Sequence, residues 1–182
     1  MERPELAVTV AKRARQAYEL ARLRHAILSA WPVPLAGWLA HRLGASEQHV
    51  LALAVPLAVA AVAMMWRGGA VGRAVPPGLA AGIAPLILPG LAMNCASACS
   101  ASCATWCATS CVAGGIVAGG IVGFRTARFG DGWWRFGIAA AAIAATTGAM
   151  GCFVGGAVGV VGMLAGFAFG AVPVLALVPR KI

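Results

Sequence analysis

The chain has 182 residues, of which 61% are apolar and 10% are charged, and its formal net charge is +9. Because soluble domains average about 45–50% apolar and about 25% charged residues, this composition excludes a disordered chain and argues against a water-soluble globule. The fourteen basic residues lie in short clusters between apolar runs, as in multi-pass membrane proteins. We therefore expect an all-α, polytopic membrane helix bundle in the lipid bilayer, with no direct binding of nucleic acid.

The first 25 residues are polar and basic, and they predict a cytoplasmic amphipathic helix over about 4–25. Its apolar strip has near-helical spacing and comprises Leu6, Val10, Ala14, Ala17 and Ala21. Two interpretations stay open, because such a helix can bind a cytosolic protein or lie on anionic lipid. The residues expected to bind a protein partner are Leu6, Val10, Lys12, Arg13, Arg15, Tyr18, Arg22 and Arg24.

Six apolar segments follow, and a helix needs roughly 17–25 such residues to cross a bilayer. The segments are 26–43, 49–66, 76–93, about 96–124, about 133–152 and 155–178.

The first of these segments is short and contains Pro32 and Pro34, so the distribution of basic residues decides whether it spans. Lys and Arg collect on the cytoplasmic side of a membrane. Six spans leave only Arg42 of the fourteen outside, whereas five spans divide them equally. The sequence thus predicts a six-helix transmembrane domain over 26–182 in an inner membrane, with both termini cytoplasmic.

The predicted spans between residues 49 and 124 contain no Asp, Glu, Lys or Arg. Pumps and ion-coupled transporters usually need an ionisable residue inside the membrane, so the sequence argues against both classes. No acid–base pair and no nucleophile with an adjacent base is visible, and we expect no enzyme activity.

Five cysteines at intervals of four residues lie at the start of the predicted fourth span, and we call them the cysteine ladder. Its five members are Cys95, Cys99, Cys103, Cys107 and Cys111. Residues four apart share one face of a helix, and the same face continues through Gly115, Gly119 and Gly123. A sixth thiol, Cys152, ends the predicted fifth span on the outer side, and we expect it at the depth of Cys95 and Cys99.

Three interpretations of the thiols remain open. Cysteine can act as a small packing residue, and the last span offers a matching face for close helix packing at Gly162, Gly166 and Gly170. Thiolates also bind soft metal ions, so a thiol-bound metal cofactor is the second interpretation. The third is a sensor in which oxidation produces a sulfenic acid or a disulfide, with Cys152 as the partner from another helix.

Three stretches and the layout of the spans resemble known bacterial regulators. The stretch ELARLRHAILSAWPVP is similar to the juxtamembrane segments of bacterial membrane anti-sigma factors. The whole layout, with the cysteine ladder, Cys152 in TGAMGC and the ending ALVPRKI, resembles the six-span, NrsF-like negative regulators of extracytoplasmic-function sigma factors. It is also similar to the six-span negative regulator of light-induced carotenoid operons.

This resemblance implies a bacterial inner-membrane anti-sigma factor. Such a protein would hold a sigma factor at its cytoplasmic N-terminus and release it on light, redox or metal stress, which makes it a negative regulator of transcription. The alternative is a membrane carrier or chaperone for a soft metal, Cu(I) or a Hg-like ion, that uses the cysteine ladder.

Overall fold

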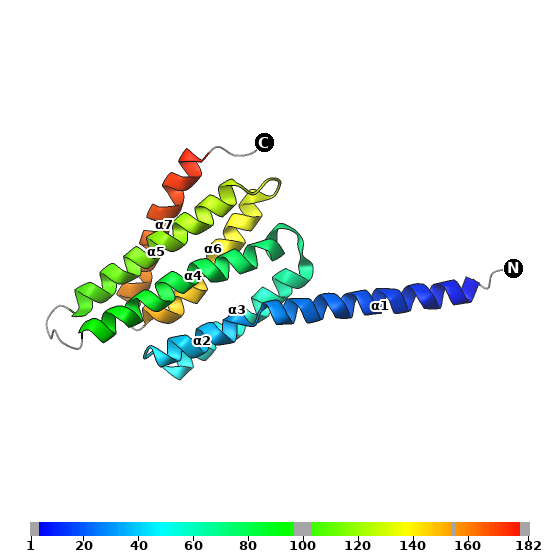
Figure 1. Ribbon diagram of the computed structural model, residues 1–182, viewed down its shortest axis with the longest axis horizontal. Helices are drawn as coiled ribbons and strands as arrows, with labels where there is room; N and C mark the ends of the chain where they lie inside the picture. Colours follow the sequence, from blue (N-terminus) through cyan, green and yellow to red (C-terminus); the bar gives the residue numbers. More distant parts are fainter. Residues whose placement is uncertain (1–3, 97–102, 154–155, 179–182) are drawn as a thin grey trace.

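The computed structural model of the protein describes residues 4–96, 103–153 and 156–178, and these residues form helices and no strand. The helices are α1 (Pro4–Ser29), α2 (Pro32–Arg42), α3 (Glu47–Arg67), α4 (Gly69–Ala96), α5 (Cys103–Ala127), α6 (Trp133–Cys152) and α7 (Gly156–Leu177). The predicted all-α class is confirmed. Helices α2 to α7 form a bundle, and most of α1 projects away from it (Figure 1).

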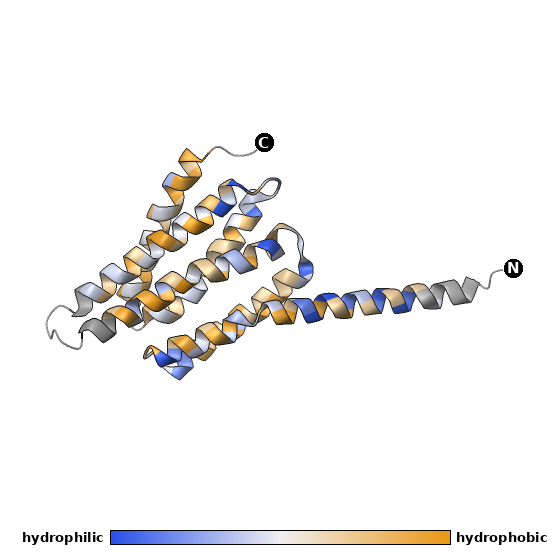
Figure 2. Ribbon diagram, viewed as in Figure 1, coloured by the Kyte–Doolittle hydropathy of each residue, from blue (hydrophilic) through white to orange (hydrophobic). Residues whose placement is uncertain are grey.

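Five helices, α3 to α7, are long and apolar enough to cross a membrane. Large apolar side chains on the outside of these helices are exposed, among them Val59 on α3, Phe169 on α7 and Leu177 at its end. The bundle is coloured mainly as hydrophobic, whereas blue residues recur along α1 (Figure 2). An apolar surface of this extent is consistent with a bundle whose surroundings are lipid.

The predicted first span, 26–43, is divided between two helices. Helix α1 continues past the predicted boundary at residue 25 and ends at Ser29, and α2 begins at Pro32. Proline has no backbone N–H and favours the first position of a helix, so Pro32 ends one helix and starts the next. Because α2 has only 11 residues, it falls outside the five candidate spans.

The predicted fourth span, about 96–124, is also different in the structure. Helix α4 extends to Ala96 and α5 begins at Cys103, so Cys95 and Cys103 lie on different helices. The expectation of one continuous ladder on one helical face is therefore wrong. Hydropathy did not distinguish the two helices, because residues 97–102 are Ala, Ser and Cys, which are as small and weakly polar as the residues on either side of them in the sequence.

Glycines set the closest helix contacts in the bundle. Helices α5 and α7 run parallel, and a Cβ added at Gly119 would clash with the carbonyl oxygen of Phe167. A Cβ at Gly170 would likewise clash with the carbonyl of Ile116. Helices α4 and α6 are also parallel, and a Cβ at Gly78 would lie 2.8 Å from the carbonyl oxygen of Ala140. Backbones approach this closely only where side chains are absent.

The two ends of the bundle differ in charge. We call the end that holds the α3–α4 turn and the α5–α6 loop the basic end; α7 also finishes there, because it is parallel to α5. Its arginines are Arg67, Arg73, Arg125, Arg128 and Arg135. Of the lysines and arginines in the described chain, only Arg42 lies at the opposite end, where α2 finishes.

Candidate functional site

Three buried thiols form a chain of contacts inside the bundle. Cys107 and Cys111 lie one turn apart on α5, Cys152 ends α6, and all three are free thiols buried from solvent. Cys111 and Cys152 pack in one buried cluster, and the thiol of Cys111 lies close enough to interact with those of Cys107 and Cys152. The chain therefore links two helices through their side chains.

The chain of thiols ends on the backbone of α4. The thiol of Cys152 donates a hydrogen bond to the carbonyl oxygen of Pro85, with the two heavy atoms 3.5 Å apart. In a regular helix the Pro85 carbonyl would accept from the residue four positions later, but that residue is Pro89, which has no N–H. Cys152 thus supplies a donor to a buried carbonyl that has lost its usual helical partner.

The packing around this site is tight on every side. A Cβ at Gly114 on α5 would lie 2.7 Å from the Cα of Pro85, and one at Gly148 on α6 would lie 2.6 Å from its ring. A Cβ at Gly159 on α7 would come within 3.4 Å of the sulfur of Cys111. Four helices meet at the thiols, so a change in their bonding acts on all four.

The structure corrects the expected depth of Cys152. The sequence places it beside Cys95 and Cys99, but it contacts Cys111, the innermost member of the predicted ladder. The side chains of Cys95 and Cys103 lie outside the described residues, as does Cys99 entirely. The depth was wrong because Cys95 and Cys111 belong to two different helices, α4 and α5, and not to one.

The described side chains contain no cluster of ligands that would support the soft-metal interpretation. Among the side chains that the structure describes, no three His, Cys, Asp or Glu residues are grouped so that they could hold a metal ion.

The glycines of the predicted packing face lie between α5 and α7: Gly115, Gly119 and Gly123 face the backbone of α7, and Gly162, Gly166 and Gly170 face α5.

The second candidate site is the basic helix α1. Of its predicted partner-binding residues, Lys12, Arg13, Arg15, Tyr18 and Arg24 are exposed, Arg22 is half-buried, and the side chains of Leu6 and Val10 are not described.

The described side chains from residue 11 to residue 21 are all exposed, and burial begins only where α1 reaches the bundle. Tyr18 is 67% exposed and Leu20 is 69% exposed, so apolar side chains on this helix are uncovered. Arg15 and Glu19 form an exposed ion pair of 3.1 Å within the helix.

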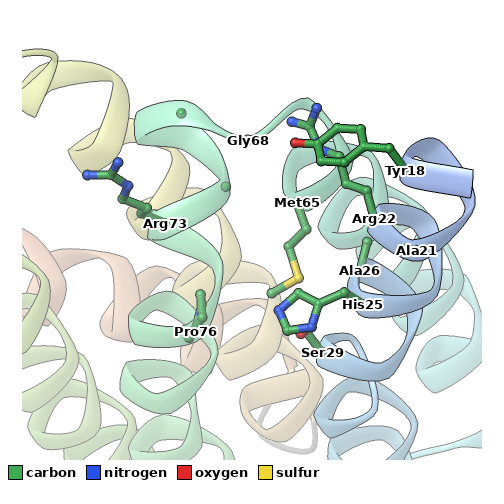
Figure 3. Close-up of a pocket in the computed structure, with 12 residues that line it drawn as sticks. Tyr18, Ala21, Arg22, His25, Ala26, Ser29, Met65, Gly68, Arg73 and Pro76 are labelled. Carbon is green, nitrogen blue, oxygen red and sulfur yellow. The ribbon is translucent and has the colours of Figure 1, made fainter. Parts of the chain in front are cut away.

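A cleft of about 610 Å³ lies where α1 meets the α3–α4 turn. Tyr18 and Arg22 lie together above Gly68, and His25 lies beside Met65 (Figure 3). The guanidinium of Arg22 covers Gly68, whose φ of +71° and lack of a Cβ both suit glycine. This contact lies where α1 leaves the bundle.

Sequence reasoning missed the residues that complete these two sites. The spacing of Pro85 and Pro89 at an interval of four signals an unpaired carbonyl and could have predicted a nearby donor. Nothing in the sequence indicates that Met65 and Gly68 would lie against α1, because that depends on how the α3–α4 turn is oriented.

Comparison with known proteins finds no matching family model, no similar curated protein and no similar solved structure.

Proposed function

We propose that the protein is a membrane-bound negative regulator of transcription that holds an extracytoplasmic-function sigma factor on α1. The observation that carries this proposal is the free helix itself: α1 leaves the bundle at the basic end with its described side chains exposed from residue 11 to residue 21. Most helical stability in proteins comes from tertiary packing, which the exposed part of α1 lacks, and uncovered Tyr18 and Leu20 add an unfavourable exposed surface. A partner that covers this helix would relieve both costs.

The proposal places the protein in a bacterial inner membrane with six crossings and with both termini in the cytoplasm. Two contacts support a first crossing made of the end of α1 together with α2. Arg22 packs over Gly68 at the start of α4, and Leu43 packs over Gly90 near the other end of that helix. From Arg22 to Leu43 the chain thus runs alongside the bundle from the level of Gly68 to that of Gly90.

The charge asymmetry supports the orientation. The basic end carries almost all arginines of the described bundle, whereas the opposite end carries Arg42. Since basic residues are retained on the cytoplasmic side, this distribution favours a cytoplasmic basic end and hence a cytoplasmic α1.

We further propose that oxidation of Cys111 and Cys152 releases the partner. Hydrogen peroxide oxidises one thiol to a sulfenic acid and leaves as water; the second thiol then condenses with it, which forms the disulfide and releases a second water. The two thiols come from different helices and pack in the same buried cluster, which suits a disulfide better than neighbours on one helix. The disulfide removes the thiol proton that Cys152 donates to Pro85.

Helix α4 connects the thiols to α1 and can couple the oxidation step to that helix. Pro85 lies in the middle of α4, and the start of that helix follows the turn on which Arg22 rests. A change in the bend of α4 would move Gly68, and with it the part of α1 around Arg22 that contacts Gly68. Coupling of this kind needs a helix with two arrangements, and α4 carries four internal prolines, at which helices commonly bend.

Deleting residues 2–22 tests the regulatory function. The truncated protein should insert normally, because the described part of the deleted segment makes its bundle contacts only at its end. We expect constitutive transcription of the genes that the released sigma factor reads, measured by RNA sequencing against the wild-type strain. Unchanged transcription, with the truncated protein present in the membrane, would contradict the proposal.

Serine variants test the thiol step separately. Cys111→Ser and Cys152→Ser keep a hydrogen-bond donor but cannot form a disulfide, so repression should persist while peroxide no longer induces the target genes. Phe169→Ala, on the exposed face of α7, is the matched control and should leave induction intact. Normal induction in both serine variants would contradict a role for this pair of thiols.

A further inference from the structure

A second cavity opens at the basic end, on the opposite side of α4 from α1. It has a volume of about 1010 Å³, at the upper end of the about 300–1,000 Å³ typical of ligand sites. Its mouth carries three arginines: Arg73 from the start of α4, Arg125 from the last turn of α5, and Arg128 just after α5. Figure 3 shows Arg73 turned away from Arg22 and from α1.

The charge at this mouth has no counterion within the described chain. The cavity wall contains no acidic residue, and none of the three arginines forms an ion pair in the part of the chain that the structure describes. One arginine is held in place, because the guanidinium carbon of Arg128 lies 4.2 Å from the centroid of the Phe124 ring. Three arginines that line one cavity suit a phosphate, whose oxygens accept hydrogen bonds from guanidinium groups.

Below the arginines the cavity wall is apolar. Ile121 and Phe124 of α5 face Pro77 and Ala80 of α4 across it, and both α5 side chains are about two-fifths exposed. This wall continues toward the middle of α4 and α5, two helices that are apolar and long enough to cross a membrane. A ligand that fits both parts has an anionic head and a hydrocarbon tail.

We infer that this cavity, which we call the arginine cavity, binds the phosphate headgroup of an anionic phospholipid, with the first part of an acyl chain along Ile121 and Phe124. Basic pockets between transmembrane helices on the cytoplasmic side suit such headgroups. The site is separate from the thiols and from α1, and its ligand would anchor the α4–α5 pair at the membrane surface.

The test is native mass spectrometry of the purified full-length protein with three probes: dioleoyl phosphatidylglycerol, dioleoyl phosphatidylcholine and chainless glycerol phosphate. We expect retention of phosphatidylglycerol, and weak or no retention of the other two. Each arginine near a lipid phosphate contributes about fivefold in affinity. The triple variant Arg73→Gln, Arg125→Gln, Arg128→Gln should therefore lower phosphatidylglycerol binding by more than about tenfold.

A matched control separates a site from general attraction. The double variant Arg67→Gln, Arg135→Gln removes charge from the same end but from outside the cavity, and it should change binding by less than about twofold. If the triple variant does not fold, Arg125→Gln alone should still lower binding about fivefold.

Filling the apolar part gives an independent measurement. Ala80→Trp should block the acyl chain and lower phosphatidylglycerol binding, whereas Val59→Trp, on the exposed face of α3, should not. Equal losses in the cavity and control variants would overturn the inference. Equal binding of phosphatidylcholine, or glycerol phosphate binding as tight as that of the lipid, would also overturn it, the latter in favour of a site for soluble phosphates.

Discussion

Helices α5 and α1 have similar lengths but opposite surroundings, and the difference shows what holds this fold together. Helix α5 lies against α4, α6 and α7, and three of its glycines, Gly115, Gly119 and Gly123, face the backbone of α7. Helix α1 touches the bundle only near its end, where Arg22 covers Gly68. Glycines let α5 pack closely against its neighbours in the bundle. The charged side chains of α1, in contrast, favour an exposed helix.

The largest effect is expected where the α5–α7 contact is broken. Gly119→Ala places a methyl group against the carbonyl of Phe167, and neither backbone can move without separating the helices. We expect the free energy of unfolding in detergent to fall by about 2–3 kcal/mol, the upper range for overpacked cores. Thermal unfolding monitored by circular dichroism measures this loss of stability.

Its control lies one residue further along. A Cβ at Gly120 meets nothing within 4 Å, so Gly120→Ala should be neutral or stabilising by up to about 1 kcal/mol through helix propensity. Equal destabilisation by the two substitutions would mean that the α5–α7 contact is looser than described.

A smaller effect is expected at Cys152. Cys152→Ala removes the thiol that donates to the carbonyl of Pro85 and should lower the free energy of unfolding by about 1–2 kcal/mol. Cys152→Ser keeps a donor and should cost less than Cys152→Ala. Thermal unfolding of the two variants side by side tests this order, and the reverse order would show that the hydrogen bond is not what Cys152 contributes.

The reason for that bond can be tested by restoring the missing donor. Pro89→Ala returns an N–H four residues after Pro85, so the carbonyl regains a partner within its own helix. In the Pro89→Ala background, Cys152→Ala should then cost about 1 kcal/mol less than in the wild type. A double-mutant cycle of unfolding free energies measures the coupling; additive effects would contradict the pairing.

The smallest effect is expected on α1. Arg15→Ala breaks the exposed pair with Glu19, and such pairs contribute less than about 0.5 kcal/mol. The thermal midpoint of the bundle should therefore not move. A clear shift would show that α1 packs against the bundle over more of its length than its end.

The sequence predicted those features of the fold that depend on composition and local spacing. The helical class follows from the apolar runs, and the α6 bounds agree with the expected 133–152. The division of the expected span 26–43 at Pro32 was not predicted, because proline is also tolerated inside membrane helices. The partner of Cys152 was missed because its depth depends on where α4 ends. The arginine cavity was missed because it depends on how α4 and α5 are turned about their axes, which spacing alone does not fix.

The central claim is that α1 is a docking helix for a cytosolic protein and not one that lies on lipid. A photocrosslinking amino acid at position 16, which is exposed on α1, tests it most directly in living cells, with the same group at Phe169 of α7 as the lipid-facing control. The account predicts one protein adduct from position 16, identified by mass spectrometry as a sigma factor, and none from position 169. Adducts with phospholipid alone at both positions would contradict it.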